Sequence, residues 1–125
     1  AEALATSENK AVIVAGIDLS HQEQEVTNIL IDLAQRRTMN YSARLAGYVV
    51  QEMERETKLL GRPHRFAGFA VLKAPDVPSV LVELGFLSNR EDNRRLNDPA
   101  YRSKVATGLT RAIDRYFQGV QAAFR

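Results

Sequence analysis

The chain has 125 residues, of which 45% are hydrophobic and 26% are charged, the composition of one globular domain rather than of a disordered or fibrous protein. Its 17 basic and 15 acidic residues are interspersed and leave a net charge of only +2, too balanced to indicate a nucleic-acid partner. The absence of cysteine excludes a disulfide scaffold and a thiolate zinc site, and no apolar run is long enough to predict a transmembrane segment.

The first half of the chain predicts three helices. Residues 1–15 have the pattern of the end of a helix with no signal peptide before it, so we expect a processed or partial form of a longer protein. Ser20 and Glu23 match a capping box, and the apolar positions behind them recur at helical spacing as far as Arg37. A third helix is expected over residues 42–60.

The pattern then changes to short apolar segments. Residues 66–73 and 77–84 are rich in β-branched side chains and are bounded by Gly and Pro, which predicts two strands. Both are apolar on both faces, as strands in the middle of a sheet are, and two strands are too few for a sheet of their own. We therefore expect an α/β fold in which further strands come from polypeptide outside this sequence.

Two more helices are predicted at the end of the chain. Asn89 is a candidate N-cap for a short helix that reaches Leu96. Asp98 followed by Pro99 combines a capping acceptor with a proline suited to the first helical position, and an amphipathic pattern follows over residues 99–120. The expected order is three helices, two buried strands and two helices.

Glu83 is the candidate catalytic residue because it is the one charged side chain among the apolar residues 80–84. A carboxylate in a dry strand costs several kcal/mol unless it is paired or solvated. Such a residue therefore has a chemical role or a partner. The alternative is a structural glutamate that pairs with Lys73 or lies in solvent, and the residues alone favour it, since charged strand residues are mostly exposed or paired.

Residues 66–89 have the sequence FAGFAVLKAPDVPSVLVELGFLSN, and residues 4–11 have the sequence LATSENKA. Together with the terminal helix, these segments closely resemble the C-terminal half of zinc-dependent N-acetylmuramoyl-L-alanine amidases, in particular the periplasmic cell-division amidases of Gram-negative bacteria. The resemblance implies a mixed sheet flanked by helices. It also implies a peptidoglycan hydrolase that cleaves the amide between the lactyl group of N-acetylmuramic acid and L-alanine of the stem peptide.

The resemblance implies that Glu83 is the general base, which takes a proton from a zinc-activated water and returns one to the departing amine. The zinc ligands of the family are two histidines and a glutamate in motifs that His21 and His64 do not match. We therefore expect Zn²⁺ to be bound by upstream polypeptide, no metal ligand in this chain and no activity of the isolated chain.

Substrate contacts are a less specific expectation. His64, Arg65 and Lys73 lie beside the predicted strands, and the two cations could attract the carboxylates of a stem peptide. The alternative, which the residue types favour, is that all three side chains are simply solvated. No other residue of this region suggests a role in substrate binding.

The helical insertion at about residues 17–38 resembles a regulatory lid that an activator with a LytM-type domain displaces. Glu23, Glu25 and Asp32 could each offer a carboxylate to the metal, although an amphipathic helix with its acidic side chains turned outward is the simpler interpretation for each of them. A rival to the enzyme is a non-catalytic interaction module that binds such an activator. The resemblance also implies a periplasmic location.

Overall fold

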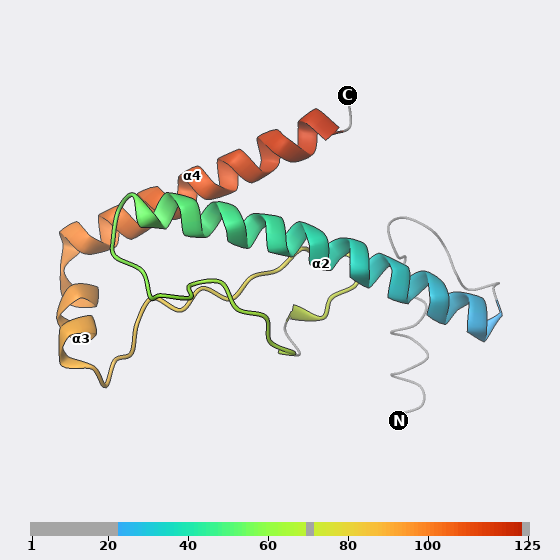
Figure 1. Ribbon diagram of the computed structural model, residues 1–125, viewed down its shortest axis with the longest axis horizontal. Coiled ribbons are helices and arrows are strands. Elements are labelled where there is room, and N and C mark those ends of the chain that lie inside the picture. The colour runs from blue at the N-terminus through green and yellow to red at the C-terminus, as the bar shows by residue number, and fades with distance from the viewer. Residues whose placement is uncertain (1–22, 70–71, 124–125) are drawn as a thin grey trace. The chain divides into compact units, whose positions relative to one another are not determined.

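The computed structural model describes residues 23–69 and 72–123 and contains three helices there, α2 (Gln24–Glu54), α3 (Arg90–Asn97) and α4 (Pro99–Ala123) (Figure 1). The described residues divide into two compact units: residues 23–41, 69 and 72–79 form the first unit, and residues 42–68 and 80–123 form the second. None of these three helices is long and apolar enough to cross a membrane.

The expected α/β fold is wrong, because the described residues form helices and no strand. The segments predicted as buried strands, 66–73 and 77–84, lack strand structure wherever they are described, and residues 81–86 are exposed rather than buried. A strand exists only through ladder hydrogen bonds to a neighbour. Apolar, β-branched composition favours an extended backbone but does not supply that neighbour.

The second and third predicted helices form one continuous helix, α2. Residues 38–41, where a break was expected, contain neither Gly nor Pro, so nothing in the backbone interrupts the helical hydrogen bonds. α2 ends at Glu54, several residues before the expected end, and the amide of Thr57 closes the last turn on the carbonyl of Met53 at 2.9 Å. The predicted helix over residues 1–15 lies outside the described residues.

The two C-terminal helices are confirmed, with their predicted caps. The side chain of Asn89 accepts from the backbone amides of Glu91 and Asp92 at the start of α3, at 3.0 Å each. The carboxylate of Asp98 accepts from the amide of Ala100 at 2.9 Å at the start of α4. Both caps satisfy amides that have no partner within their own helix.

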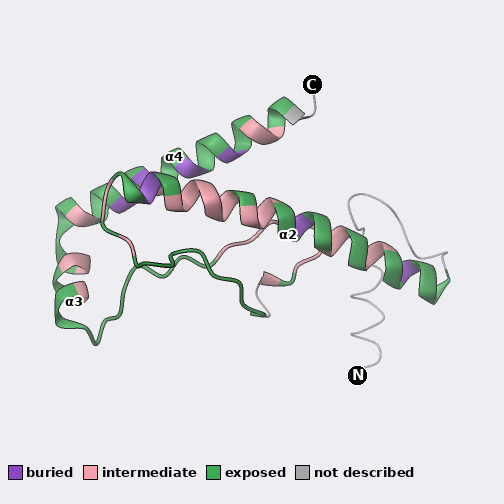
Figure 2. Cartoon of the chain, viewed as in Figure 1, coloured by how far each residue is buried: buried purple, intermediate pink, exposed green. Residues whose placement is uncertain are grey.

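The core of the second unit lies where the end of α2 meets α4 (Figure 2). Val105, Ala112 and Tyr116 recur at helical spacing on one face of α4, and each is at most 7% exposed. Gly108 lies on the same face, and a Cβ atom added there would lie 2.9 Å from the sulfur of Met53. Small residues on α4 therefore allow the two helices to approach closely.

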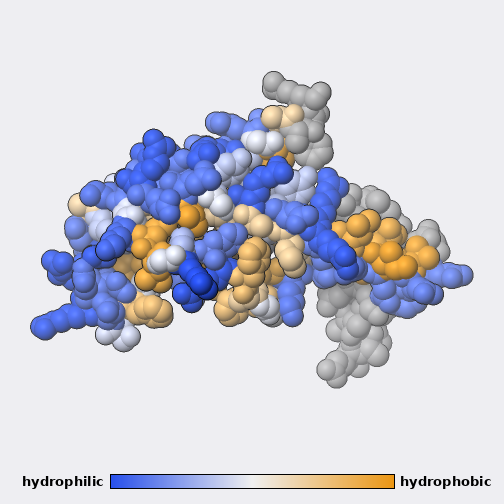
Figure 3. All heavy atoms as spheres, viewed as in Figure 1, coloured by the Kyte–Doolittle hydropathy of each residue, from blue (hydrophilic) through white to orange (hydrophobic). Residues whose placement is uncertain are grey.

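In the first unit, two side chains of α2 bind the irregular segment 72–79. The hydroxyl of Thr38 donates to the carbonyl of Pro75 at 2.7 Å, and the amide of Gln35 donates to the carbonyl of Lys73 at 3.4 Å. Figure 3 shows hydrophobic side chains at the surface over the N-terminal part of α2, where Ile29 and Leu33 are 61% and 62% exposed. This part of α2 thus carries an apolar stripe that the described residues leave exposed.

Candidate functional site

Glu83 lies in the irregular segment that precedes α3 in the second unit, and it is exposed. Its carboxylate makes no hydrogen bond or ion pair with any other described residue of the second unit. The expectation that it lies in a dry strand is therefore wrong, and the energetic argument from burial does not apply to it. The carboxylate is accessible to solvent and to a substrate.

Gly85, two residues after Glu83, has a positive φ of +152°. This region of backbone conformation is open essentially only to glycine. A Cβ atom at Gly85 would also lie 3.0 Å from Cβ and Cγ of Asp92. The next amide, that of Phe86, donates to Oδ2 of Asp92 at 3.0 Å, and its carbonyl accepts from the amide of Asn89 at 2.9 Å. We call residues 85–92 the Gly85 corner.

Two of the three candidate substrate contacts, His64 and Arg65, lie in the same unit as Glu83 but have other partners. His64 is exposed and its ring lies against that of Phe66, with centroids 4.8 Å apart, while Nε of Arg65 donates to a backbone carbonyl at 3.3 Å. Within the described part of the chain, neither side chain forms a hydrogen bond or ion pair with Glu83. Lys73 belongs to the first unit, so its pairing with Glu83 stays a prediction.

Glu23 and Glu25 are exposed near the start of α2, as the simpler interpretation expected. Asp32 forms an exposed ion pair with Arg36 at 3.0 Å. No three histidine, aspartate or glutamate side chains among residues 23–69 and 72–123 are placed to hold a metal ion together.

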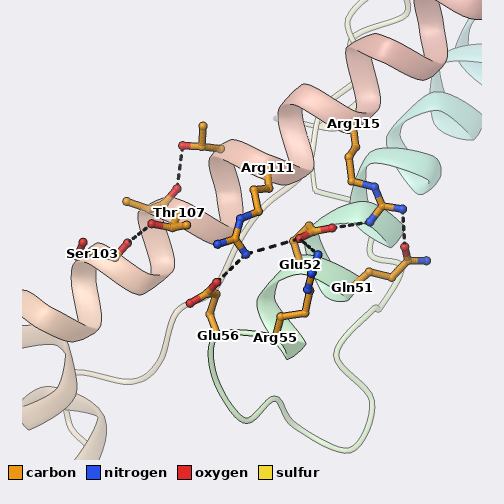
Figure 4. Close-up of polar contacts among 10 residues, drawn as sticks. Gln51, Glu52, Arg55, Glu56, Ser103, Thr107, Arg111 and Arg115 are labelled. Atoms are coloured by element: carbon orange, nitrogen blue, oxygen red, sulfur yellow. Dashed lines mark hydrogen bonds and ion pairs between the residues drawn. The ribbon is translucent and has the colours of Figure 1, made fainter.

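A cluster of charged side chains joins the end of α2 to α4 (Figure 4), and nothing in the sequence analysis predicted it. Glu52 lies at its centre and is 1% exposed. Its carboxylate accepts from Arg115 at 2.6 Å and from Arg55 at 3.0 Å, and it lies 4.0 Å from Arg111. Arg111 also donates to Glu56 at 2.7 Å. We call these five residues the Glu52 cluster.

The arginines of the Glu52 cluster fix the charge of its central carboxylate. The hydrogen bond from Arg115 lowers the pKa of Glu52 most, burial opposes this by raising it, and Arg55 lowers it further, so that the pKa lies below its ordinary value. Arg115 is itself held by Gln51 at 3.1 Å and by the ring of Tyr48, whose centroid lies 4.7 Å from its guanidinium carbon. Glu52 is thus fully engaged in packing two helices and is not placed to react.

One signal for the Glu52 cluster is present in the sequence. Glu52 and Glu56 are four residues apart, as are Arg111 and Arg115, so that each pair lies on one face of its helix. Equal spacing of opposite charges is compatible with pairing between two helices. It does not identify which helices meet, because the partners lie 55 and 63 residues apart along the chain.

The described residues thus present an accessible carboxylate two residues before the Gly85 corner, and they hold no metal ligand set. The family model described as N-acetylmuramoyl-L-alanine amidase matches residues 5–115. The chain therefore belongs to this family.

Curated relatives agree with the family match. The chain is 37% identical over 117 residues to N-acetylmuramoyl-L-alanine amidase AmiA of Escherichia coli K12, which covers 94% of the chain and 40% of that relative. It is 34% identical to the amidase AmiC of E. coli O6:H1 over 94% of the chain, and 34% identical to AmiC of Neisseria meningitidis over 93%, with 28% of each of these relatives covered. The chain thus spans well under half the length of these relatives. No solved structure matches it.

Proposed function

We propose that this chain is the C-terminal part of the catalytic domain of a peptidoglycan hydrolase. The bond cleaved is the amide between the lactyl group of N-acetylmuramic acid and L-alanine of the stem peptide. The observation that carries the proposal is the family match over residues 5–115, together with the identities to amidases from two genera. The relatives also favour action on the cell wall, and we propose a periplasmic location.

In this proposal Glu83 is the general base. Its carboxylate accepts a proton from the water that attacks the amide carbonyl, and it returns that proton to the nitrogen of L-alanine as the C–N bond breaks. The products are a lactyl carboxylic acid and a free amine. The exposure of Glu83 supports this role, because a base must reach both the water and the substrate nitrogen.

The family is generally zinc-dependent, yet the described residues do not fit a zinc site, since they hold no suitable group of three ligands. His64 lies against Phe66, and it forms no metal-binding group with other histidine, aspartate or glutamate side chains of the described chain. We propose that Zn²⁺ belongs to the whole enzyme and that its ligands come from polypeptide upstream of this sequence.

The test uses the full-length, zinc-loaded amidase that carries this chain. Glu83→Gln removes the base without changing its size, so we expect peptidoglycan hydrolysis to fall by about 10²- to 10⁴-fold while zinc content stays constant. Asp114→Asn is the matched control, because it removes an exposed carboxylate of α4. Hydrolysis by Glu83→Gln within twofold of the wild type would remove Glu83 from the mechanism.

The first unit favours a second function, the binding of a LytM-type activator. Val26, Ile29 and Leu33 follow one another at helical spacing on α2, and they are 39%, 61% and 62% exposed. An exposed apolar stripe on a helix suits a protein partner. The rival to the enzyme, a non-catalytic interaction module, would bind the activator in the same way, but the whole protein would then hydrolyse no peptidoglycan.

Ile29→Lys tests this surface in the full-length enzyme. Loss of an isoleucine that the activator would bury should weaken activator binding by roughly ten- to a hundredfold, measured as the activator concentration that gives half-maximal stimulation. Asn28→Lys adds the same charge at the neighbouring exposed position and should have a much smaller effect. Equal effects of the two variants would show that the apolar stripe is not the binding surface.

A further inference from the structure

We propose that Asp92 is a positioning residue for Glu83, acting through the Gly85 corner. The inference rests on the proposed role of Glu83 as base. It assigns to Asp92 the task of fixing the backbone on which that base is carried. Asp92 itself does not touch the substrate or the reacting atoms in this proposal.

The first observation is the contact between Asp92 and the corner. Oδ2 of Asp92 accepts from the amide of Phe86 at 3.0 Å, and Cβ and Cγ of Asp92 lie 3.0 Å from where a Cβ atom at residue 85 would be. Gly85, with its positive φ, directly precedes the Phe86 amide that meets this carboxylate. A glycine and an aspartate seven residues apart thus form one tight contact.

The second observation is that Asp92 is itself held firmly. It lies in the first turn of α3, where Asn89 accepts from its backbone amide at 3.0 Å. The amide of Asn93 donates to the carbonyl of Asn89 at 2.9 Å, and the side chain of Asn93 donates to the carbonyl of Leu87 at 3.3 Å. The carboxylate of Asp92 is therefore presented by an ordered helix start.

The neighbouring carboxylate gives a contrast. Glu91 also lies in the first turn of α3, but its side chain pairs with Arg95 on the helix and not with the amide of Phe86. Two adjacent acidic residues thus have different partners. Of these two carboxylates, that of Asp92 is the one that binds the backbone leading from Glu83.

The position of Glu83 depends on this connection because the segment before the corner has little support of its own. Residues 80–84 belong to no helix or strand of the described structure, and the Glu83 carboxylate has no partner among the described residues of the second unit. The Phe86 amide is three residues away, which corresponds to about 10 Å of extended chain. A displacement of about 1 Å in a catalytic group can reduce the rate by roughly a hundredfold.

The experiment compares Asp92→Ala with Glu91→Ala in the full-length, zinc-loaded amidase. We expect Asp92→Ala to lower kcat by roughly ten- to a hundredfold with KM within twofold and zinc content unchanged. Hydrogen exchange at the Phe86 amide should become faster, since its acceptor is lost. Glu91→Ala should change neither quantity. Asp92→Asn keeps an oxygen acceptor of the same size and should restore most of kcat.

Gly85→Ala provides a second test if Asp92→Ala is too unstable to purify. Its methyl group would meet Asp92 at 3.0 Å, so the same loss of kcat and the same faster exchange at Phe86 are expected. The inference is overturned if the Phe86 amide of the wild type is unprotected, or if these corner variants keep wild-type kcat while Glu83→Gln is inactive. An active Glu83→Gln enzyme would instead refute the proposed function, and the positioning role with it.

Discussion

Glu52 and Glu83 are carboxylates of the second unit in opposite environments. Glu52 is 1% exposed and is bonded to Arg55 and Arg115, whereas Glu83 is exposed and has no partner among the residues described in that unit. A buried carboxylate requires such partners, because an uncompensated charge in the interior is strongly destabilising. Burial therefore marks Glu52 as a structural glutamate, whereas exposure leaves Glu83 accessible for its proposed role as the base.

The charge of Glu52 makes the stability of the second unit depend on pH. Because its pKa is lower in the folded than in the unfolded state, its stabilisation is fully present above the ordinary value of about 4.3, and it is lost as the pH falls through the lower folded pKa. The wild type should thus exceed Glu52→Gln in free energy of unfolding near pH 7, and the difference should shrink below about pH 4. Urea denaturation across this range measures it.

Glu54→Gln is the control for this prediction, because Glu54 is an exposed carboxylate of the same helical turn. It should change the free energy of unfolding little at any pH, as is usual for exposed charges. A difference between the wild type and Glu52→Gln that stayed constant from neutral to acidic pH would contradict the assignment of the ionised form to the folded state.

Among the helices, the packing of α2 on α4 depends on small residues. Ala112 is 0% exposed and lies on the same face of α4 as Gly108, so a larger side chain has no space without displacing a neighbour. Ala112→Leu should lower the free energy of unfolding by about 1–3 kcal/mol, the usual cost of overpacking. Ala106→Leu places the same side chain at an exposed position of α4 and should be near neutral. Equal melting temperatures for the two variants would contradict close packing at Ala112.

The helices show which features can be predicted from sequence. The starts of α3 and α4 were predicted at Asn89 and Asp98, because a cap is formed by residues within three positions of one another. The strands over residues 66–73 and 77–84 were predicted wrongly, since a strand depends on a partner that local composition does not reveal. The break expected within α2 was also wrong, because a change of apolar pattern without Gly or Pro does not end a helix.

The candidate site also has features that the sequence predicts and features that it does not. Glu83 was singled out by its place in a long family motif. The family of the chain is confirmed, whereas the catalytic role of Glu83 stays a proposal. The contact between Asp92 and the Phe86 amide was not predicted, and neither was the Glu52 cluster. To predict the Asp92 contact, one would have to know the backbone conformation at Gly85, which precedes the Phe86 amide. To predict the Glu52 cluster, one would have to know which helices pack together. Neither property can be read from one sequence.

Taken as a whole, the chain leaves many large apolar side chains uncovered in the parts that are described. Phe66, Phe86 and Leu87 are 75%, 63% and 73% exposed in the second unit, and Leu33 is 62% exposed in the first. Single exposed apolar residues are ordinary, but contiguous apolar surface usually marks a contact with other polypeptide. The chain covers 40% of the AmiA relative, so in a whole amidase other polypeptide is available to cover these side chains.

The isolated 125-residue chain should therefore behave differently from the full-length amidase. We expect it to bind the dye ANS with several-fold higher fluorescence per mole and to elute as self-associated species at micromolar concentration, because its apolar side chains are accessible. The double variant Phe66→Ser and Phe86→Ser should lower the fluorescence, since it removes two aromatic side chains that are 75% and 63% exposed. A monomeric isolated chain with the dye response of the full-length enzyme would mean that these side chains are covered within the chain itself.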